Sequence, residues 1–206
     1  MIGKKLEKLA CVLMENESNP DIDKEIIVYG LSCALEHAAS IITSIVLGLL
    51  FGLTLEIIVF LMTFSFIRTY AGGYHCKKAI NCYLMSSGVI ILVLGIIKFT
   101  PERYMLYLGI AMLFIAIPVL LKLAPVETPS KPLDGDEQKY YYKKTVVHLG
   151  IESAVILILF LLKQNRFSFL VCIGIALSAG LVFAQCQQNG NRIFGCIHSK
   201  FQQFKL

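Results

Sequence analysis

Long apolar segments alternate with short polar segments along most of this chain. The apolar segments have the composition and approximate length of membrane-spanning helices, and glycines, prolines and charged residues separate them. The pattern therefore predicts an all-α integral membrane protein with six transmembrane helices. We expect these helices at residues 26–51, 55–67, 80–97, 104–121, 146–162 and 167–183.

The N-terminal residues follow a different pattern. In residues 2–14, apolar side chains recur at helical spacing opposite several charged side chains. This arrangement predicts an amphipathic helix that lies on the membrane surface, followed by a turn that ends at Pro20. The segment lacks the features of a cleaved secretory signal, so we expect it to stay on the mature protein. We expect one transmembrane domain over residues 1–206: an interfacial helix and turn at 1–20, a six-span bundle at 26–184, and a cytoplasmic tail at 185–206.

The composition agrees with a membrane protein. The chain is 56% hydrophobic and 16% charged, and its mean hydropathy of +0.70 lies outside the range of ordinary soluble domains. Seven cysteines, an odd number without a C-x-x-C pair, do not suggest a disulfide framework. The net charge of +5 is scattered between apolar segments. We therefore expect contact with membrane lipid and no nucleic-acid partner.

Lysine and arginine fall unevenly on the two sides of the predicted bundle. With six spans, fifteen of these residues lie on one side and four on the other. Cytoplasmic loops of membrane proteins accumulate Lys and Arg. We therefore expect a multi-pass protein of the cell membrane, with both termini and the segment between the second and third spans on the cytoplasmic side.

That segment, residues 68–82, concentrates the chemistry of the chain. It contains Arg68, the pair Gly72 and Gly73, His75 and Cys82. A thiolate is a strong nucleophile, and an imidazole can take the proton of the thiol. The glycine pair can release the backbone from helical geometry. The combination therefore suggests a cysteine nucleophile with a histidine base.

Helix geometry limits how His75 and Cys82 can meet. In one straight helix they would stand about 10.5 Å apart along the axis, which is too far for a direct hydrogen bond. We therefore expect His75 in a non-helical segment that folds back, and Cys82 near the start of the third span. A helix start, with Lys77 and Lys78 close by, would favour the thiolate. Cys76 fits less well, because an extended segment would point it away from the neighbouring histidine.

Other interpretations use some of the same residues. A metal site could combine His75, Cys76 and Cys82 with Glu36 or His37, but the spacing matches no standard zinc pattern, so we expect no metal and no cofactor. Glu36 and His37 lie inside the first predicted span, where ionisable groups are costly. They could line the substrate path of a peptide exporter, which would not need Cys82, or Glu36 could orient His75 or bond a neighbouring helix. A non-enzymatic membrane binding partner is a third possibility.

Two stretches of the sequence form specific motifs: Arg68-x-x-Ala71-Gly72-Gly73-x-His75, followed by Cys82, and Ala124-Pro125-Val126-Glu127-x-Pro129-x-Lys131-Pro132. They resemble motifs of the accessory gene regulator B (AgrB) family, and the resemblance covers nearly the whole chain. It implies a cysteine endopeptidase of quorum sensing that removes the C-terminal segment of a short AgrD-like propeptide and promotes formation of a thiolactone ring. The catalytic pair would be His75 and Cys82, with Arg68 and Gly73 as supporting positions.

The resemblance also suggests roles for further residues. An acyl-enzyme thioester on Cys82 would be attacked by an internal thiol of the propeptide, which closes the ring. Backbone N–H groups near Cys82, the side chain of Asn81 and Arg68 are alternative donors to the oxyanion. Lys77, Lys78 and Lys131 are expected to contact an acidic peptide or anionic lipid. A homodimer, in which the histidine of one chain serves the cysteine of another, is also possible.

Overall fold

The structure, a computed structural model, describes residues 24–74, 79–127 and 133–189. These residues form six helices and no strands, and each helix is long and apolar enough to cross a membrane. The predicted six-span all-α fold is confirmed. The predicted interfacial helix at the N-terminus lies outside the described residues. The helices are α2 (Lys24–Phe51), α3 (Thr54–Ala71), α4 (Ala79–Phe99), α5 (Glu102–Leu123), α6 (Gly135–Leu161) and α7 (Asn165–Gln188).

Several helices extend beyond the predicted spans. α3 continues to Ala71, so Arg68 lies in its last turn and not in the loop that follows. α6 begins at Gly135, well before the predicted start, because Asp134 and Glu137 form a capping box at its N-terminus. α7 continues to Gln188, into the segment predicted as a tail. The polar loop predicted between the fourth and fifth spans is correspondingly shorter.

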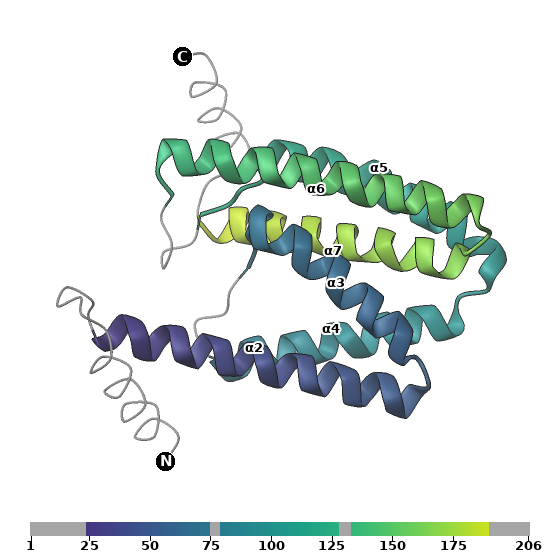
Figure 1. The fold of residues 1–206 in the computed structure, drawn as a ribbon, viewed down its shortest axis with the longest axis horizontal. Helices are drawn as coiled ribbons and strands as arrows, with labels where there is room; N and C mark the ends of the chain where they lie inside the picture. The colour runs from purple at the N-terminus through teal and green to yellow at the C-terminus, as the bar shows by residue number, and fades with distance from the viewer. Residues whose placement is uncertain (1–23, 75–78, 128–132, 190–206) are drawn as a thin grey trace.

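Helix α7 lies at the centre of the bundle (Figure 1) and is buried along most of its length. It packs against α5, α3 and α6, whereas α2 and α4 pack against each other on the far side of α3. Helix α3 thus joins a group formed by α5, α6 and α7 to the pair α2 and α4. We call the end of the bundle where α3 ends and α4 begins the site end.

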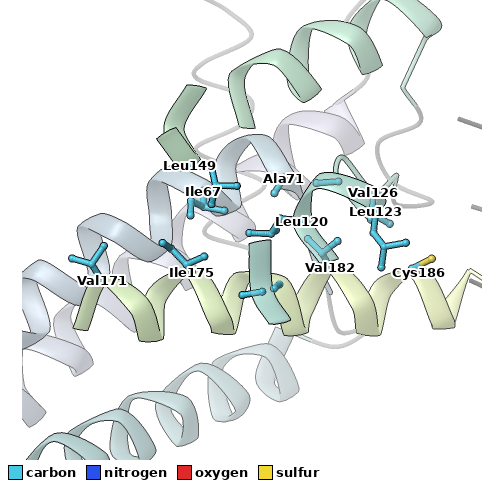
Figure 2. Close-up of a cluster of buried hydrophobic side chains, with 13 residues drawn as sticks. Ile67, Ala71, Leu120, Leu123, Val126, Leu149, Val171, Ile175, Val182 and Cys186 are labelled. Carbon is cyan, nitrogen blue, oxygen red and sulfur yellow. The ribbon is translucent and has the colours of Figure 1, made fainter. Parts of the chain in front are cut away.

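Two clusters of buried apolar side chains hold the helices together. The first joins α3, α5, α6, α7 and the residues after α5, and it includes Ile67, Leu120, Val126 and Ile175 (Figure 2). The second joins α3, α4, α5 and α7, with Phe60 and Ile90 among its members. Many large apolar side chains on the outer faces are exposed, as expected for helices that face lipid.

Candidate active site

The backbone leaves helical geometry directly after α3. Gly72 has φ +76° and ψ −159°, and Gly73 has φ +150°. A Cβ atom on Gly72 would lie 2.7 Å from the carbonyl oxygen of Val126, and one on Gly73 would lie 2.7 Å from Nη1 of Arg68. Residues other than glycine rarely adopt such φ values, and at position 72 a Cβ atom would also collide with the backbone of Val126. Both glycines are therefore required by the local fold.

Hydrogen bonds fix the short segment 72–74 against the bundle. The backbone N–H of Tyr74 donates to the carbonyl of Leu181 in α7 at 3.1 Å. Nη2 of Arg68 donates to the carbonyl of Tyr74 at 2.9 Å, and the Gly72 N–H donates to the Arg68 carbonyl at 3.1 Å. The chain immediately before His75 is thus tied to α3 and α7. The non-helical segment begins at Gly72 and not at Arg68, because Arg68 to Ala71 complete α3. The predicted fold-back of His75 lies outside the described residues and stays a prediction.

The second sequence motif packs directly against the first. The N–H of Val126 donates to the carbonyl of Ala71 at 3.1 Å. Glu127 accepts a hydrogen bond from Nε2 of Gln138 through its side chain, and its carbonyl accepts one from Nδ2 of Asn189 at 2.8 Å. The residues after α5 are therefore held by α6 and by the end of α7. In this way they form one wall beside the glycine pair.

Cys82 lies in the first turn of α4, where its thiol is free and half-buried. This confirms the prediction that the cysteine stands near the start of the third span. Asn81 precedes it and is exposed, and it is not among the described residues that line the cavity below. Its predicted role as an oxyanion donor stays a prediction. His75, Lys77, Lys78 and Lys131 lie outside the described residues.

A cavity of about 620 Å³ lies between α2, α3 and α4, beside the segment 72–74 and the residues that follow α5. Its volume is within the usual range of small-molecule and cofactor sites. It brings together five predicted site residues that are far apart in the sequence: Glu36, Arg68, Gly72, Gly73 and Cys82.

Helix α2 also places His37 in this cavity. From the sequence, His37 is expected only as a metal ligand or as part of an exporter. Its position beside Glu36, inside an apolar span, is the signal that could have indicated a cavity-lining role. Tyr83 is a further lining residue, and its hydroxyl shares a hydrogen bond with Oγ1 of Thr43 at 2.9 Å.

The site offers no metal centre within the part of the chain that the structure describes. No group of three His, Cys, Asp or Glu side chains there could hold a metal ion. The cavity instead combines a thiol, a carboxyl group, an imidazole and a guanidinium group with a largely apolar lining. A thiol beside ionisable groups is a combination that can support nucleophilic chemistry.

The fold and the cavity define a multi-pass helical membrane protein with a cysteine at the start of one span. A family model described as "Accessory gene regulator B" matches residues 6–184, and the chain belongs to this family. The membership associates it with the accessory gene regulator system.

Several relatives bear AgrB-like names. One from Clostridium perfringens (strain SM101 / Type A) is 33% identical over 145 residues, which is 68% of each chain. One from Listeria innocua is 28% identical over 140 residues, 67% of this chain and 68% of the relative. One from Clostridium acetobutylicum is 35% identical over 104 residues, 49% of this chain and 47% of the relative. No solved structure matches the chain.

Proposed function

We propose that this protein is a membrane cysteine endopeptidase that removes the C-terminal segment of an AgrD-like propeptide and promotes thiolactone formation. The observation that carries the proposal is the free, half-buried thiol of Cys82, which lines a cavity of about 620 Å³ together with Arg68 and the glycine pair. Family membership supports the same assignment. A site on the cytoplasmic side of the cell membrane would be accessible to a propeptide that has not been exported.

The proposed mechanism begins with proton transfer from the Cys82 thiol to the imidazole of His75. The thiolate attacks the scissile carbonyl, and collapse of the tetrahedral intermediate breaks the C–N bond. The leaving amine takes the proton from His75, and a thioester remains on Cys82. A thiolate of the propeptide then attacks this thioester, closes the ring and returns the Cys82 thiolate.

Arg68 supports this chemistry through the backbone. Its guanidinium group holds the carbonyl of Tyr74, and Tyr74 directly precedes His75 in the sequence. A charge-assisted hydrogen bond at this point restricts where the following residue can lie. We therefore assign Arg68 as a positioning residue for His75, in addition to the substrate or oxyanion contacts that its sequence position suggests. Glu36, which lines the same cavity, is proposed as a second positioning residue.

The test of the proposal is propeptide cleavage by the purified protein in proteoliposomes. Both Cys82→Ala and Cys82→Ser should lower kcat/KM by more than about 10³-fold, because each removes the nucleophile. Mass spectrometry of the wild-type protein after an acid quench should show a propeptide fragment attached to Cys82. Cys76→Ser, the matched control, should retain substantial cleavage.

The same assay separates the peptidase from a peptide exporter. An exporter would bind and move the propeptide through a central cavity and would not need the thiol. Cleavage that survives both Cys82 variants would contradict the peptidase mechanism. Loss of cleavage in Cys76→Ser, with retention in Cys82→Ala, would show that the other thiol is the nucleophile.

A further inference from the structure

The hydroxyl of Tyr83 is a polar group of the cavity that the proposed mechanism does not use. Tyr83 follows Cys82 in α4, is half-buried and lines the same cavity. The lining residues of α4 form one stripe along the helix: Cys82, Tyr83, Met85, Ser86, Val89 and Ile90. Because successive residues of a helix point about 100° apart, Cys82 lies near the middle of this stripe and Tyr83 lies at one edge.

Helix α2 fixes the Tyr83 side chain from outside the cavity. The phenolic oxygen of Tyr83 lies 2.9 Å from Oγ1 of Thr43, in a part-buried contact between α4 and α2. Thr43 itself is not among the described lining residues. The edge of the stripe that carries Tyr83 therefore faces α2, and the phenol is held on the side of Cys82 toward that helix.

The other hydroxyl groups of the helices indicate which partner donates in this contact. Several donate to the carbonyl four residues earlier in their own helix: Ser44, Thr69, Thr145, Ser153 and Ser178. In the described chain, the Thr43 hydroxyl instead has Tyr83 as its partner. This pattern indicates that Thr43 donates and that the Tyr83 oxygen accepts. The phenolic proton is then left for a group in the cavity, and a hydroxyl that accepts a hydrogen bond becomes a stronger donor.

From this arrangement we infer that Tyr83 is a catalytic residue whose hydroxyl donates a hydrogen bond to the oxyanion formed when Cys82 attacks the scissile carbonyl. Thr43 is the positioning residue behind it. The inference rests on the proposed peptidase function. Attack forms the S–C bond and moves an electron pair of the C=O bond onto oxygen, while the phenol keeps its proton. Collapse restores the C=O bond and breaks the C–N bond.

The same donor would act twice. Ring closure passes through a second tetrahedral intermediate at the same carbon atom, in which the thiolate of the propeptide adds and the Cys82 thiolate leaves. The carbonyl oxygen stays in place between the two steps, because the acyl group remains attached to Cys82. Loss of the Tyr83 hydroxyl should therefore slow both cleavage and ring closure.

The described geometry supports Tyr83 over two donors considered from the sequence. Asn81 is exposed and is not among the described lining residues. Nη2 of Arg68 is bonded to the carbonyl of Tyr74. The first N–H groups of a helix have no intrahelical partner, so the start of α4 can supply a second donor that acts together with the phenol.

The test is Tyr83→Phe in the proteoliposome cleavage assay, because this change removes only the hydroxyl. Loss of one oxyanion donor costs about 10²–10³-fold in kcat, so we expect kcat to fall by about 10²-fold. KM should stay within about threefold, because the oxyanion is absent from the bound ground state. Tyr107→Phe is the matched control: Tyr107 of α5 is 71% exposed and lies outside the described lining, and its rate should stay near wild type.

Alkylation of Cys82 separates oxyanion stabilisation from an effect on the thiol. A thiolate attacks iodoacetamide at a saturated carbon, so no oxyanion forms. The rate of Cys82 alkylation, followed by mass spectrometry of the peptide that contains it, should be the same in Tyr83→Phe and in the wild type. A parallel fall in alkylation and cleavage would show that Tyr83 acts on the thiol or on the fold, and would overturn the inference.

Substitutions of Thr43 test the positioning role. Thr43→Val keeps the shape of the side chain but removes its hydroxyl, and it should lower kcat by about tenfold, as expected for one lost hydrogen bond. Thr43→Ser keeps the hydroxyl and should stay near wild type. In the double variant Tyr83→Phe/Thr43→Val, kcat should be no lower than in Tyr83→Phe alone, because Thr43 acts through Tyr83. Losses that multiply would contradict this route.

These outcomes separate the inference from the proposed function. If cleavage requires Cys82 but Tyr83→Phe keeps the wild-type kcat, the peptidase stands and the inference is wrong. Cleavage that survives both Cys82→Ala and Cys82→Ser would overturn both proposals. If Tyr83→Phe fails to accumulate in the membrane, the two Thr43 variants decide, and equal kcat in Thr43→Val and Thr43→Ser would overturn the inference.

Discussion

Gly72 is the residue on which the geometry of the site depends most directly. Its backbone conformation is one that only glycine adopts without strain, and its α-carbon faces the carbonyl of Val126 so closely that no Cβ fits. The turn therefore brings the end of α3 against the second motif. It also directs the chain toward Leu181, where the Tyr74 N–H is bound.

Gly72→Ala tests whether the turn at Gly72 positions the chain that leads to His75. The new methyl group would shift the backbone before His75, and a displacement of about 1 Å at a catalytic group costs on the order of 10²-fold in rate. We expect kcat/KM for propeptide cleavage to fall by about that factor. Gly88→Ala is the matched control, because a Cβ at Gly88 in α4 would meet nothing within 4 Å, and its rate should stay near wild type.

The thermal midpoint should be measured for both glycine variants. A modest fall is expected for Gly72→Ala, and a slight rise for Gly88→Ala, because alanine favours a helix over glycine by up to about 1 kcal/mol. Equal activities in the two variants would contradict the role assigned to Gly72.

The sequence predicted part of this arrangement. The glycine pair indicated a bend, and helix arithmetic placed Cys82 near a helix start, as the structure confirms. The contact between Gly72 and Val126 could not be predicted, because it depends on how α5 and α7 bring a segment far along the chain against α3. The bond from Arg68 to Tyr74 was missed for a similar reason: an arginine at a membrane interface has several ordinary roles.

At the scale of helices, α2 provides the wall that faces Cys82. It is joined to α4 through Thr43 and Tyr83, and it places both Glu36 and His37 in the cavity. The chain therefore carries two histidines that could serve the thiol. His37 precedes Thr43, the partner of Tyr83, by six residues, which is about 9 Å along α2.

Substitution of each histidine should identify the base. His75→Ala should lower cleavage by about 10²–10⁴-fold, the usual contribution of a positioned general base. His37→Ala should lower it only a few-fold, because the proposed mechanism assigns the proton transfer to His75 and only a cavity-lining position to His37. The rate of Cys82 alkylation by iodoacetamide should fall in His75→Ala and stay near wild type in His37→Ala. The reverse pattern in both assays would assign the proton transfer to α2.

Helix boundaries show what hydropathy can and cannot reveal. The apolar segments located all six spans, because lipid contact requires apolar side chains over the thickness of the bilayer. The structure extends α3 to Ala71 and starts α6 at Gly135. These extra turns contain polar residues, and their helical geometry depends on capping and on contacts between helices, which hydropathy does not measure.

At the scale of the whole molecule, six helices place the start of α6 and the turn between α6 and α7 at opposite ends of the bundle (Figure 1). Most of the Lys and Arg residues that the structure describes lie at the site end, among them Lys24, Lys122 and Lys139. Lys98, Arg103, Lys163 and Arg166 belong to the other end. From the positive-inside rule we therefore predict that the site end, with Cys82, faces the cytoplasm.

Cysteine labelling tests this orientation. In a variant with the native cysteines replaced by serine, Asp136→Cys and Gln164→Cys place single thiols at exposed positions at the two ends of α6. A membrane-impermeant maleimide added to intact spheroplasts should label Gln164→Cys at once, and Asp136→Cys only after permeabilisation. Labelling of both from outside would contradict the six-span topology. The opposite pattern would place Cys82 outside the cell, where a propeptide could reach it only after export. The proposal that cleavage precedes export would then be wrong.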